Sequence, residues 1–519
     1  MARKHGDEAA AAPERPGGAL AFVRKVLPLV VLAALLVHPT QVTVRQWADA
    51  LAAALGSSGG LARVIPPVRV CVSDILFAGA FVLWLALNAT DRRLLGRLRH
   101  YPLPLLAVLL CAALSAAPFL KPSGLFTGRQ LAYGRAAREL VQLFIFFGCT
   151  YLVLADYMRE AVWRRRLTAS FLCAAAFGIA VGVRQYARLR PSGPAAPGAI
   201  LSPADVDGPF GFRGEPAGPH EQAGTLSNRN VLGAWASLVV PIFWALALCL
   251  RRPLARASCG VAAAAGLLLL LQGGLWLATI VALLVMAYVR GLKSFAVTAA
   301  ALFVFWAVVF RFAPEQHGMV LLDSVALHRS YDRFHTLPLY GALEPGAAVA
   351  PARLSTEDNS MWQQKFIEWQ PGLAAAARSP VFGVGLGNYQ SNINAFYAPR
   401  PDPFYNPDGV YDIAKPVANL MESGANSFYL VWLVETGFVG LFALLWLLVF
   451  SLGRAAYSYE WSLSGFEKGL GLGSLGALCA MAGGMLFANY LVRGVGVAAV
   501  FVLATAVALS EAVGGEAGA

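Results

Sequence analysis

The stretch ANSFYLVWLVETGFVGLFALLWLLVF, residues 425–450, contains a single charged side chain, that of Glu435. A helix crosses the hydrocarbon core of a bilayer with about 20 mainly apolar residues. This stretch is therefore long and apolar enough to span a membrane. Comparable apolar runs recur along the whole chain, separated by short turns that carry arginine. The pattern predicts an integral membrane protein that crosses the bilayer many times.

The composition agrees with a membrane protein and argues against a soluble one. Hydrophobic residues make up 58% of the chain and charged residues 13%, with a mean hydropathy of +0.59, whereas soluble domains carry about 25% charged residues. The formal net charge of +12 is spread over short turns between apolar runs, which argues against nucleic acid as a partner. The seven cysteines form no CxxC pair. We therefore expect no metal site, disulfide framework or cofactor.

The apolar runs predict an all-α bundle of about twelve transmembrane helices, with a large extracytoplasmic loop before the tenth. The predicted spans lie near 22–38, 70–90, 103–120, 139–156, 167–186, 230–250, 257–272, 274–290, 294–312, 425–450, 468–490 and 494–512. The least secure junction is at Gly273, because 257–290 also reads as one long kinked segment. Both possibilities remain open from the sequence.

The distribution of basic residues predicts the orientation of the bundle. On the twelve-span threading, most arginines and lysines of the turns fall on one side: Arg3, Lys4, Arg15, Arg24, Lys25, Arg92, Arg93, Arg97, Arg99, Arg159, Arg164, Arg165, Arg166, Arg251, Arg252, Arg256, Arg290, Lys293, Arg454 and Lys468. Loops rich in lysine and arginine stay in the cytoplasm. This predicts a multi-pass protein of the cell inner (plasma) membrane with both termini cytoplasmic.

The same threading predicts the organisation of the chain. It divides the sequence into a disordered cytoplasmic N-terminus, nine helices that enclose an outer loop at 187–229, a large periplasmic loop, three further helices and a C-terminal tail. The corresponding ranges are 1–19, 20–312, 313–424, 425–512 and 513–519. The polar composition of 313–424 contrasts with the apolar runs on either side, which predicts that this region lies outside the membrane.

Within the large loop, the stretch SPVFGVGLGNY at 379–389 places glycine at every second position from Gly383 to Gly387. Dinucleotide-binding loops require the spacing GxGxxG after a strand, which is absent here, so nucleotide binding is rejected. We expect these glycines to adopt positive φ or to allow close backbone approach. Ahead of this turn, residues 361–377 predict a helix with Trp362, Phe366 and Trp369 on one face.

Several segments, taken in order, resemble the O-antigen ligase / O-antigen polymerase superfamily of membrane glycan-transfer proteins. Residues 224–241, GTLSNRNVLGAWASLVVP, are similar to the family's G-T-F-x-N-x-N entry into a membrane helix. Residues 379–390, SPVFGVGLGNYQ, resemble its P-x-x-G-x-G-x-x-x-F turn. Residues 425–445 resemble H-N-x-x-L-x-x-x-x-E-x-G-x-x-G, and residues 73–87 fit the family's second helix more loosely.

The resemblance has two departures and a functional implication. The histidine that the family places before asparagine is Ala425 here, and the Ser-Arg pair at the start of a middle helix is replaced around Gly273. The resemblance implies transfer or polymerisation of a glycan from a polyprenyl-pyrophosphate carrier to a glycan or lipid acceptor on the extracytoplasmic face, as in lipopolysaccharide synthesis. Membrane lipids are the other expected partner, and the sequence does not reveal the oligomeric state.

Arginines are the natural groups to bind the pyrophosphate, because a guanidinium forms bidentate hydrogen bonds and needs no metal. The predicted substrate-binding residues are Arg229, Arg311, Arg184, Asn228 and Asn230. An acceptor hydroxyl also needs a base.

The predicted catalytic residues are Glu422 and Asn426, which precede the tenth predicted helix. Glu435, inside that helix, is a further candidate, with a hydrogen bond to a neighbouring helix as its alternative role. Two other classes stay open, a twelve-helix transporter and a catalytically silent scaffold of a polysaccharide export system. Against the transporter stands the lack of an internal repeat between the halves of the chain.

Overall fold

The computed structural model describes residues 18–40, 71–90, 94–98, 101–119, 130–188, 229–270, 273–312, 369, 372–389, 427–490 and 495–517. These residues form helices joined by turns, and no β-strand occurs among them. The predicted all-α class is therefore confirmed for the described part of the chain. Residues 1–17 of the predicted N-terminal segment 1–19 and most of both predicted outer loops lie outside it, whereas Gly18 and Ala19 begin the first helix.

The first half of the chain forms helices that follow the predicted apolar runs. They are α1 (Gly18–Val37), η1 (His38–Thr40), α4 (Val72–Thr90), α5 (Leu94–Leu98), α6 (Leu103–Ala116), η2 (Ala117–Phe119), α7 (Gln130–Leu143), the π-helical η4 (Phe144–Thr150), α8 (Tyr151–Arg159) and α9 (Ala161–Arg188). The second half forms α10 (Arg229–Cys249), α11 (Pro253–Leu267), α12 (Gly273–Arg290), α13 (Leu292–Phe312), α19 (Phe428–Trp461), α20 (Gly465–Gly484) and α21 (Val495–Ala517).

Eight helical stretches of the described residues are long and apolar enough to cross a membrane. They lie in α1 with η1, α4, α7 to α8, α9, α10, α13, α19 and α21. Two shorter apolar helices, in α6 and α12, accompany them. A chain with this many apolar helices belongs in a membrane.

The structure corrects several predicted boundaries, and α19 continues past the predicted end at 450 to Trp461. Residues 513–517, predicted as part of a C-terminal tail, continue α21. Helix α9 begins at Ala161 and not near 167, because Arg164 in its first turn is buried and paired instead of lying in a solvated turn. The uncertain junction at Gly273 is also settled, because α11 and α12 are separate helices. Both pack on α10, and only α12 also packs closely on α20 and α13.

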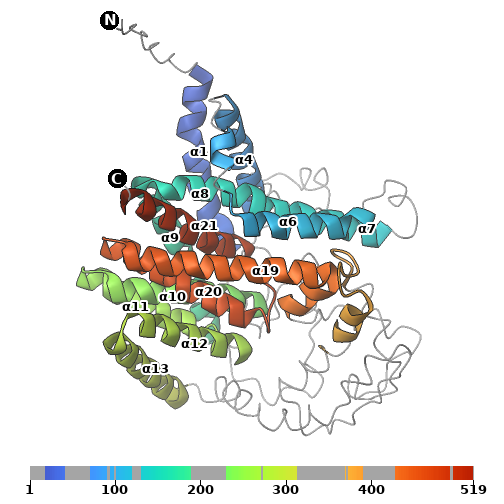
Figure 1. Ribbon diagram of the computed structural model, residues 1–519. Coiled ribbons are helices and arrows are strands. Elements are labelled where there is room, and N and C mark those ends of the chain that lie inside the picture. Colours follow the sequence, from blue (N-terminus) through green and yellow to red (C-terminus); the bar gives the residue numbers. More distant parts are fainter. Residues whose placement is uncertain are drawn as a thin grey trace, which may run out of the picture.

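Helix α20 lies at the centre of the second half of the molecule, in contact with α10, α12, α19 and α21 (Figure 1). Glycines on α20 allow this close packing. A Cβ atom at Gly473 would lie 2.8 Å from Ile242 Cα, and one at Gly469 would lie 2.8 Å from a methyl carbon of Leu246. Small residues let helix backbones approach closely where lipid supplies no hydrophobic driving force. The α10–α20 pair thus forms the most extensive helix–helix contact among the described residues.

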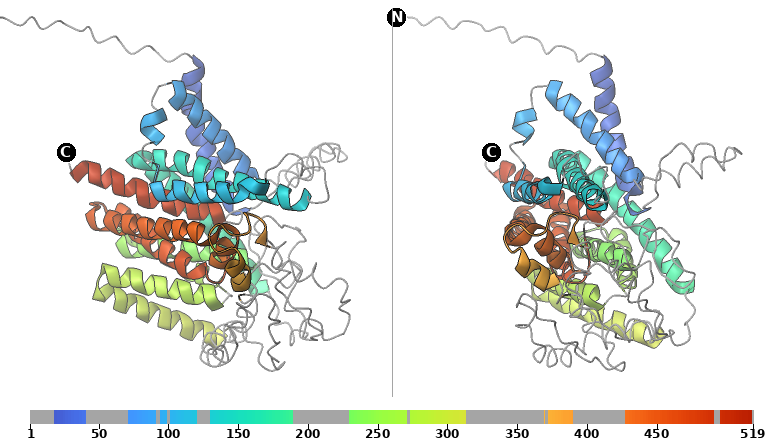
Figure 2. Two further views of the ribbon diagram at one scale, coloured as in Figure 1. Left: turned by 45° about the vertical axis from the view of Figure 1, so that its right-hand side comes forward. Right: turned by 90° about the vertical axis from the view of Figure 1, so that its right-hand side faces the viewer.

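Helices α1 and α4 pack side by side and run across the direction of the other helices (Figures 1 and 2). The base of α1 is fixed through His38, which is fully buried. Its Nδ1 donates to the carbonyl oxygen of Leu35 at 2.6 Å, and its Nε2 accepts from Trp235 Nε1 at 3.3 Å. The ring also stacks on Phe171, with centroids 5.1 Å apart. These contacts join α1 to α9 and α10.

The bundle has two ends, which we name after α19, the Phe428 end and the Trp461 end. Helices α10, α12 and α19 begin at the Phe428 end, while α20 begins at the Trp461 end next to the last residue of α10. A Cβ atom at Gly465 would lie 2.7 Å from the carbonyl oxygen of Cys249. The turn between α10 and α11, with exposed Arg251 and Arg252, therefore lies at the Trp461 end, together with exposed Arg256 at the start of α11.

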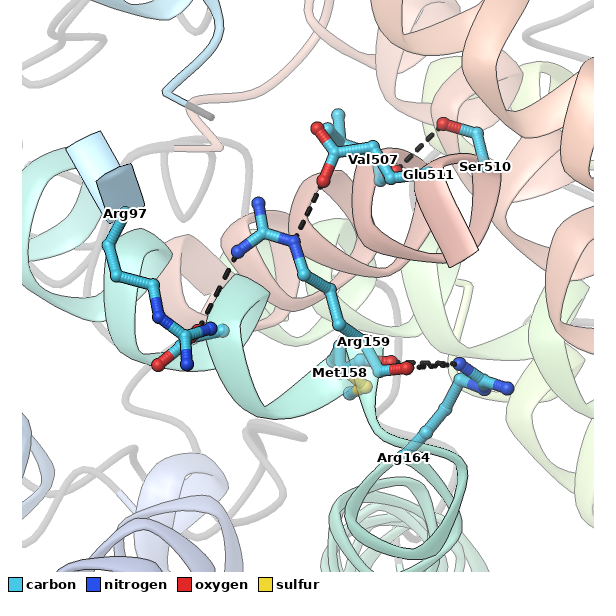
Figure 3. A network of polar contacts seen from close by, with 8 residues as sticks. Arg97, Met158, Arg159, Arg164, Val507, Ser510 and Glu511 are labelled. Atoms are coloured by element: carbon cyan, nitrogen blue, oxygen red, sulfur yellow. Dashed lines mark hydrogen bonds and ion pairs between the residues drawn. The ribbon is translucent and has the colours of Figure 1, made fainter. Parts of the chain in front are cut away.

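Ion pairs tie several helices together at the Trp461 end (Figure 3). Asp156 in α8 accepts from Trp84 Nε1 at 2.9 Å and pairs with Arg97 of α5. Arg159, at the end of α8, lies 3.6 Å from Asp156 and donates from Nε to Glu511 of α21 at 2.8 Å. Two of the arginines that sequence analysis assigned to cytoplasmic turns are therefore partly neutralised by acids.

The most enclosed of these arginines is Arg164, in the first turn of α9. Its Nη1 donates to the carbonyl oxygens of Met158 and Arg159 at 3.0 and 3.2 Å, which satisfies the last turn of α8. Its Nη2 pairs with Glu467 of α20. Glu467 in turn accepts from Ser464 Oγ, the residue that caps α20. One guanidinium thus links three helix ends.

Candidate functional site: a break in helix α19

Helix α19 is broken at Gly437, which has φ 69° and ψ −170°. Only glycine adopts this conformation without strain, because it has no Cβ atom. The break interrupts the ladder of helical hydrogen bonds and frees backbone groups on both sides. In a membrane helix such groups need partners from the protein, because lipid offers none. The partners come from residues 379–389, far away in the sequence.

The carbonyl groups before the break accept hydrogen bonds from the turn 379–389. Val384 N donates to the carbonyl oxygen of Val434 at 2.8 Å, and Gly385 N donates to that of Glu435 at 3.0 Å. The same oxygen of Glu435 also accepts from Ser115 Oγ of α6 at 2.6 Å. The turn and α6 together therefore satisfy the backbone that α19 leaves open.

The amide groups after the break donate back to the same turn. Phe438 N donates to the carbonyl oxygen of Pro380 at 2.7 Å, and Val439 N donates to that of Val381 at 3.3 Å. Residues 379–389 thus act as a wedge, with two hydrogen bonds to each side of the break. We call this segment the wedge.

Glycines make the approach of the two backbones possible. A Cβ atom at Gly383 would lie 2.4 Å from the carbonyl carbon of Glu435, and one at Gly437 would lie 2.2 Å from the carbonyl oxygen of Val381. Gly383, Gly385 and Gly387 all have positive φ, at 70°, 102° and 73°. The prediction that these glycines serve positive φ and close backbone approach is confirmed.

The Glu435 side chain is buried, with 3% of its surface exposed, and it also contacts the wedge. Its Oε1 accepts from Tyr389 N at 3.0 Å. The carboxylate thus binds the wedge, while Ser115 of α6 binds the main-chain oxygen of the same residue. An ionisable residue within a membrane helix is a functional candidate by default.

A small apolar cluster holds the segment ahead of the wedge against α19. Ala375 and Ala376, from the helical residues 372–378, pack with Tyr389, Leu430 and Val434, and Trp369 lies against this cluster. The predicted helix of 361–377 is described only at Trp369 and from residue 372 onward. Trp362 and Phe366 lie outside the described residues.

The predicted arginine site is only partly described. Arg184 is exposed on α9, and Arg311 is exposed in the last turn of α13. Helix α9 packs mainly on α1, α8 and α11, whereas α13 packs mainly on α12, so no main helix contact joins the elements that carry these two residues. Arg229 and Asn230 begin α10, but their side chains are not described. Asn228, Glu422 and Asn426 lie outside the described residues.

The hydrogen bonds that Glu435 forms with the wedge and with Ser115 were not predicted from the sequence. Glu435 was available as a signal, because it is the only charge in 425–450. Its partners could not be read from the sequence, since they lie 46 and 320 residues away. No group of His, Cys, Asp and Glu side chains suited to a metal ion occurs in the part of the chain that the structure describes.

Comparison of the chain with protein-family models gives no match, and comparison with curated proteins gives none.

Proposed function

We propose that this protein is a membrane glycan transferase similar to the O-antigen ligases and polymerases. It would take a glycan from a polyprenyl-pyrophosphate carrier and pass it to a glycan or lipid acceptor on the extracytoplasmic face of the cell membrane. In this proposal about twelve helices span the bilayer, both termini are cytoplasmic, and the regions 187–229 and 313–424 lie outside, at the Phe428 end.

One observation supports this proposal above the others, the docking of the wedge in the break of α19. The resemblance rests on separate short motifs, and two of them are the glycine turn at 379–390 and the E-x-G helix at 425–445. Their glycines and Glu435 are the residues that make the contact. Two motifs that form one site are expected to lie in contact, whereas two unrelated motifs are not.

The proposed reaction exchanges one bond for another at the anomeric carbon of the donor sugar. The bond from this carbon to the pyrophosphate oxygen breaks, and a bond to the acceptor hydroxyl oxygen forms. The acceptor proton passes to a base, for which Glu422 is the predicted residue. Polyprenyl pyrophosphate leaves with the electron pair, and the predicted arginines Arg229, Arg311 and Arg184 stabilise its charge.

Release of polyprenyl pyrophosphate tests the proposal without knowledge of the acceptor. Purified protein in liposomes receives a polyprenyl-pyrophosphate-linked glycan together with an extract of cell-envelope glycolipids. We expect release by the wild type and its loss in Arg229→Ala and Arg311→Ala. Arg251→Ala is the matched control, because Arg251 is exposed just beyond the opposite end of α10. Equal release by all four proteins would reject the proposed arginine site.

A transporter is the second candidate, and the broken helix is the observation that favours it. Transporters often bind their substrates at discontinuous membrane helices. Uptake of the lipid-linked glycan into proteoliposomes, with the pyrophosphate bond intact, would support transport. Cleavage of that bond would support transfer, so the same liposomes separate the two classes.

A further inference from the structure

The wedge carries large apolar side chains on its surface, which is unusual for a segment outside the membrane. Val381 is 52% exposed and Phe382 is 63% exposed. They follow directly on Pro380 and precede the glycines that enter the break. Exposed apolar side chains that lie together point to a surface covered by another apolar phase.

These two side chains continue an apolar face of α19. Phe438, Val439 and Phe442 are exposed on that helix just beyond the break. The backbone hydrogen bond from Val439 N to the carbonyl oxygen of Val381 places the wedge beside this face. Helix α19 is a candidate membrane span, so its exposed apolar residues face acyl chains. Val381 and Phe382 extend the same surface.

The backbone of the wedge meets the main requirement for irregular structure at membrane depth. Such structure is tolerated only where the protein satisfies its polar groups. Six amides of the wedge donate within the protein, those of Ser379, Gly383, Val384, Gly385, Asn388 and Tyr389. The missing amide of Pro380 removes one donor, and the carbonyls of residues 380 and 381 accept from α19.

The position of the break along α19 agrees with this depth. From Gly437 to Arg454, the next charged residue of the helix, α19 rises about 26 Å at 1.5 Å per residue. The hydrocarbon core is about 30 Å thick. With Arg454 at one boundary, residues 437–439 lie inside the opposite boundary. Val381, which is bonded to Val439, lies at the same level.

We propose that residues 379–389 form a re-entrant element of the membrane domain, with Val381 and Phe382 in contact with lipid acyl chains. The predicted extracytoplasmic loop would then be interrupted by a segment that returns into the bilayer and is held there by the broken helix. This inference requires only that the chain spans a membrane. It does not depend on the proposed glycan transfer.

Photo-crosslinking from the acyl chain tests the proposal on the unmodified protein. The full chain is reconstituted in phosphatidylcholine vesicles that contain a lipid with a diazirine in the middle of one acyl chain, and adducts are mapped by mass spectrometry. We expect adducts at Val381 and Phe382 comparable to those at Phe442, the matched aromatic residue of α19, which is 67% exposed. Leu463, which is 91% exposed in the turn after α19, is the aqueous reference and should carry few.

Hydroxyl-radical footprinting of the same vesicles provides the complementary readout from water. The proposal expects Leu463 to be oxidised and Phe382 to be protected. Oxidation of Phe382 to the level of Leu463, together with acyl-chain adducts no more frequent than at Leu463, would overturn it. Loss of transfer activity has no bearing on this outcome, so failure here and failure of the proposed function are separable.

Discussion

Glu435 stabilises the docked wedge through a buried hydrogen bond from Tyr389 N to Oε1. Substitution Glu435→Ala removes the acceptor and leaves the Tyr389 amide without this partner. An unsatisfied buried donor costs about 1–3 kcal/mol. We therefore expect Glu435→Ala to lower the unfolding free energy in detergent by about that amount, measured by denaturant titration.

Glu435→Gln is the matched control for this substitution. The glutamine side chain keeps a carbonyl oxygen where Oε1 accepts from Tyr389. It should retain most of the stability that alanine loses. Equal losses in the two variants would show that the hydrogen bond to the wedge does not account for the role of Glu435.

Gly383 tests the close approach of wedge and helix. Gly383→Ala places a Cβ atom 2.4 Å from the backbone of Glu435, at a residue with φ 70°. Backbone strain of this kind costs about 1–3 kcal/mol before the clash is counted. Gly79→Ala on α4 is the control, because a Cβ atom there meets nothing within 4 Å. Thermal unfolding should distinguish them, with Gly383→Ala destabilised and Gly79→Ala unchanged or slightly stabilised.

At the scale of the helices, the close packing of α20 on α10 depends on glycines, which have no side chain. Gly473→Ala would put a Cβ atom 2.8 Å from Ile242 Cα, which is backbone and cannot rotate away. The two helices would have to separate, so we expect lower thermal stability. Gly453→Ala on α19, where a Cβ atom meets nothing within 4 Å, should not lower it. A stable Gly473→Ala protein would contradict the packing described for α20.

The positions of the helices could be predicted because each apolar run carries its own signal. The predicted spans 230–250 and 425–450 overlap the observed apolar helices at 231–249 and 428–461, since burial in lipid needs only local apolarity. The start of α9 was not predicted because the charge of Arg164 suggested a cytoplasmic turn. Its partner Glu467 lies 303 residues away and could not be identified from the sequence. The glycine spacing predicted positive φ in the wedge, but not the helix that it enters.

The candidate site was harder to predict, because its contacts also join residues that are far apart in the sequence. Arg184 and Arg311 were both predicted to bind the pyrophosphate, whereas the structure places them on α9 and α13, which share no main packing contact. The contact that the structure does form joins Gly383, whose positive φ was predicted, to Gly437 and Glu435, whose contact with it was not. Long-range pairing is the information that a single sequence lacks.

For the whole molecule, the ion pairs at the Trp461 end hold the helices of both halves together. Arg164→Ala would remove the partner of Glu467 and the donor to two carbonyl groups of α8. Loss of one member of a buried pair costs about 3–5 kcal/mol. We expect a marked drop in unfolding free energy, with Arg165→Ala, an exposed neighbour, close to wild type. Similar unfolding free energies for both variants would show that the contacts of Arg164 do not stabilise the protein.

The orientation of the bundle decides where any reaction takes place, and cysteine labelling in intact cells measures it directly. Arg400→Cys, in the predicted periplasmic loop, and Leu463→Cys, at the Trp461 end, are treated with a membrane-impermeant maleimide, with the wild type as background for the native cysteines. We expect Arg400→Cys to be labelled in intact cells and Leu463→Cys to be labelled only after permeabilisation. The reverse pattern would place the Phe428 end in the cytoplasm and contradict transfer on the extracytoplasmic face.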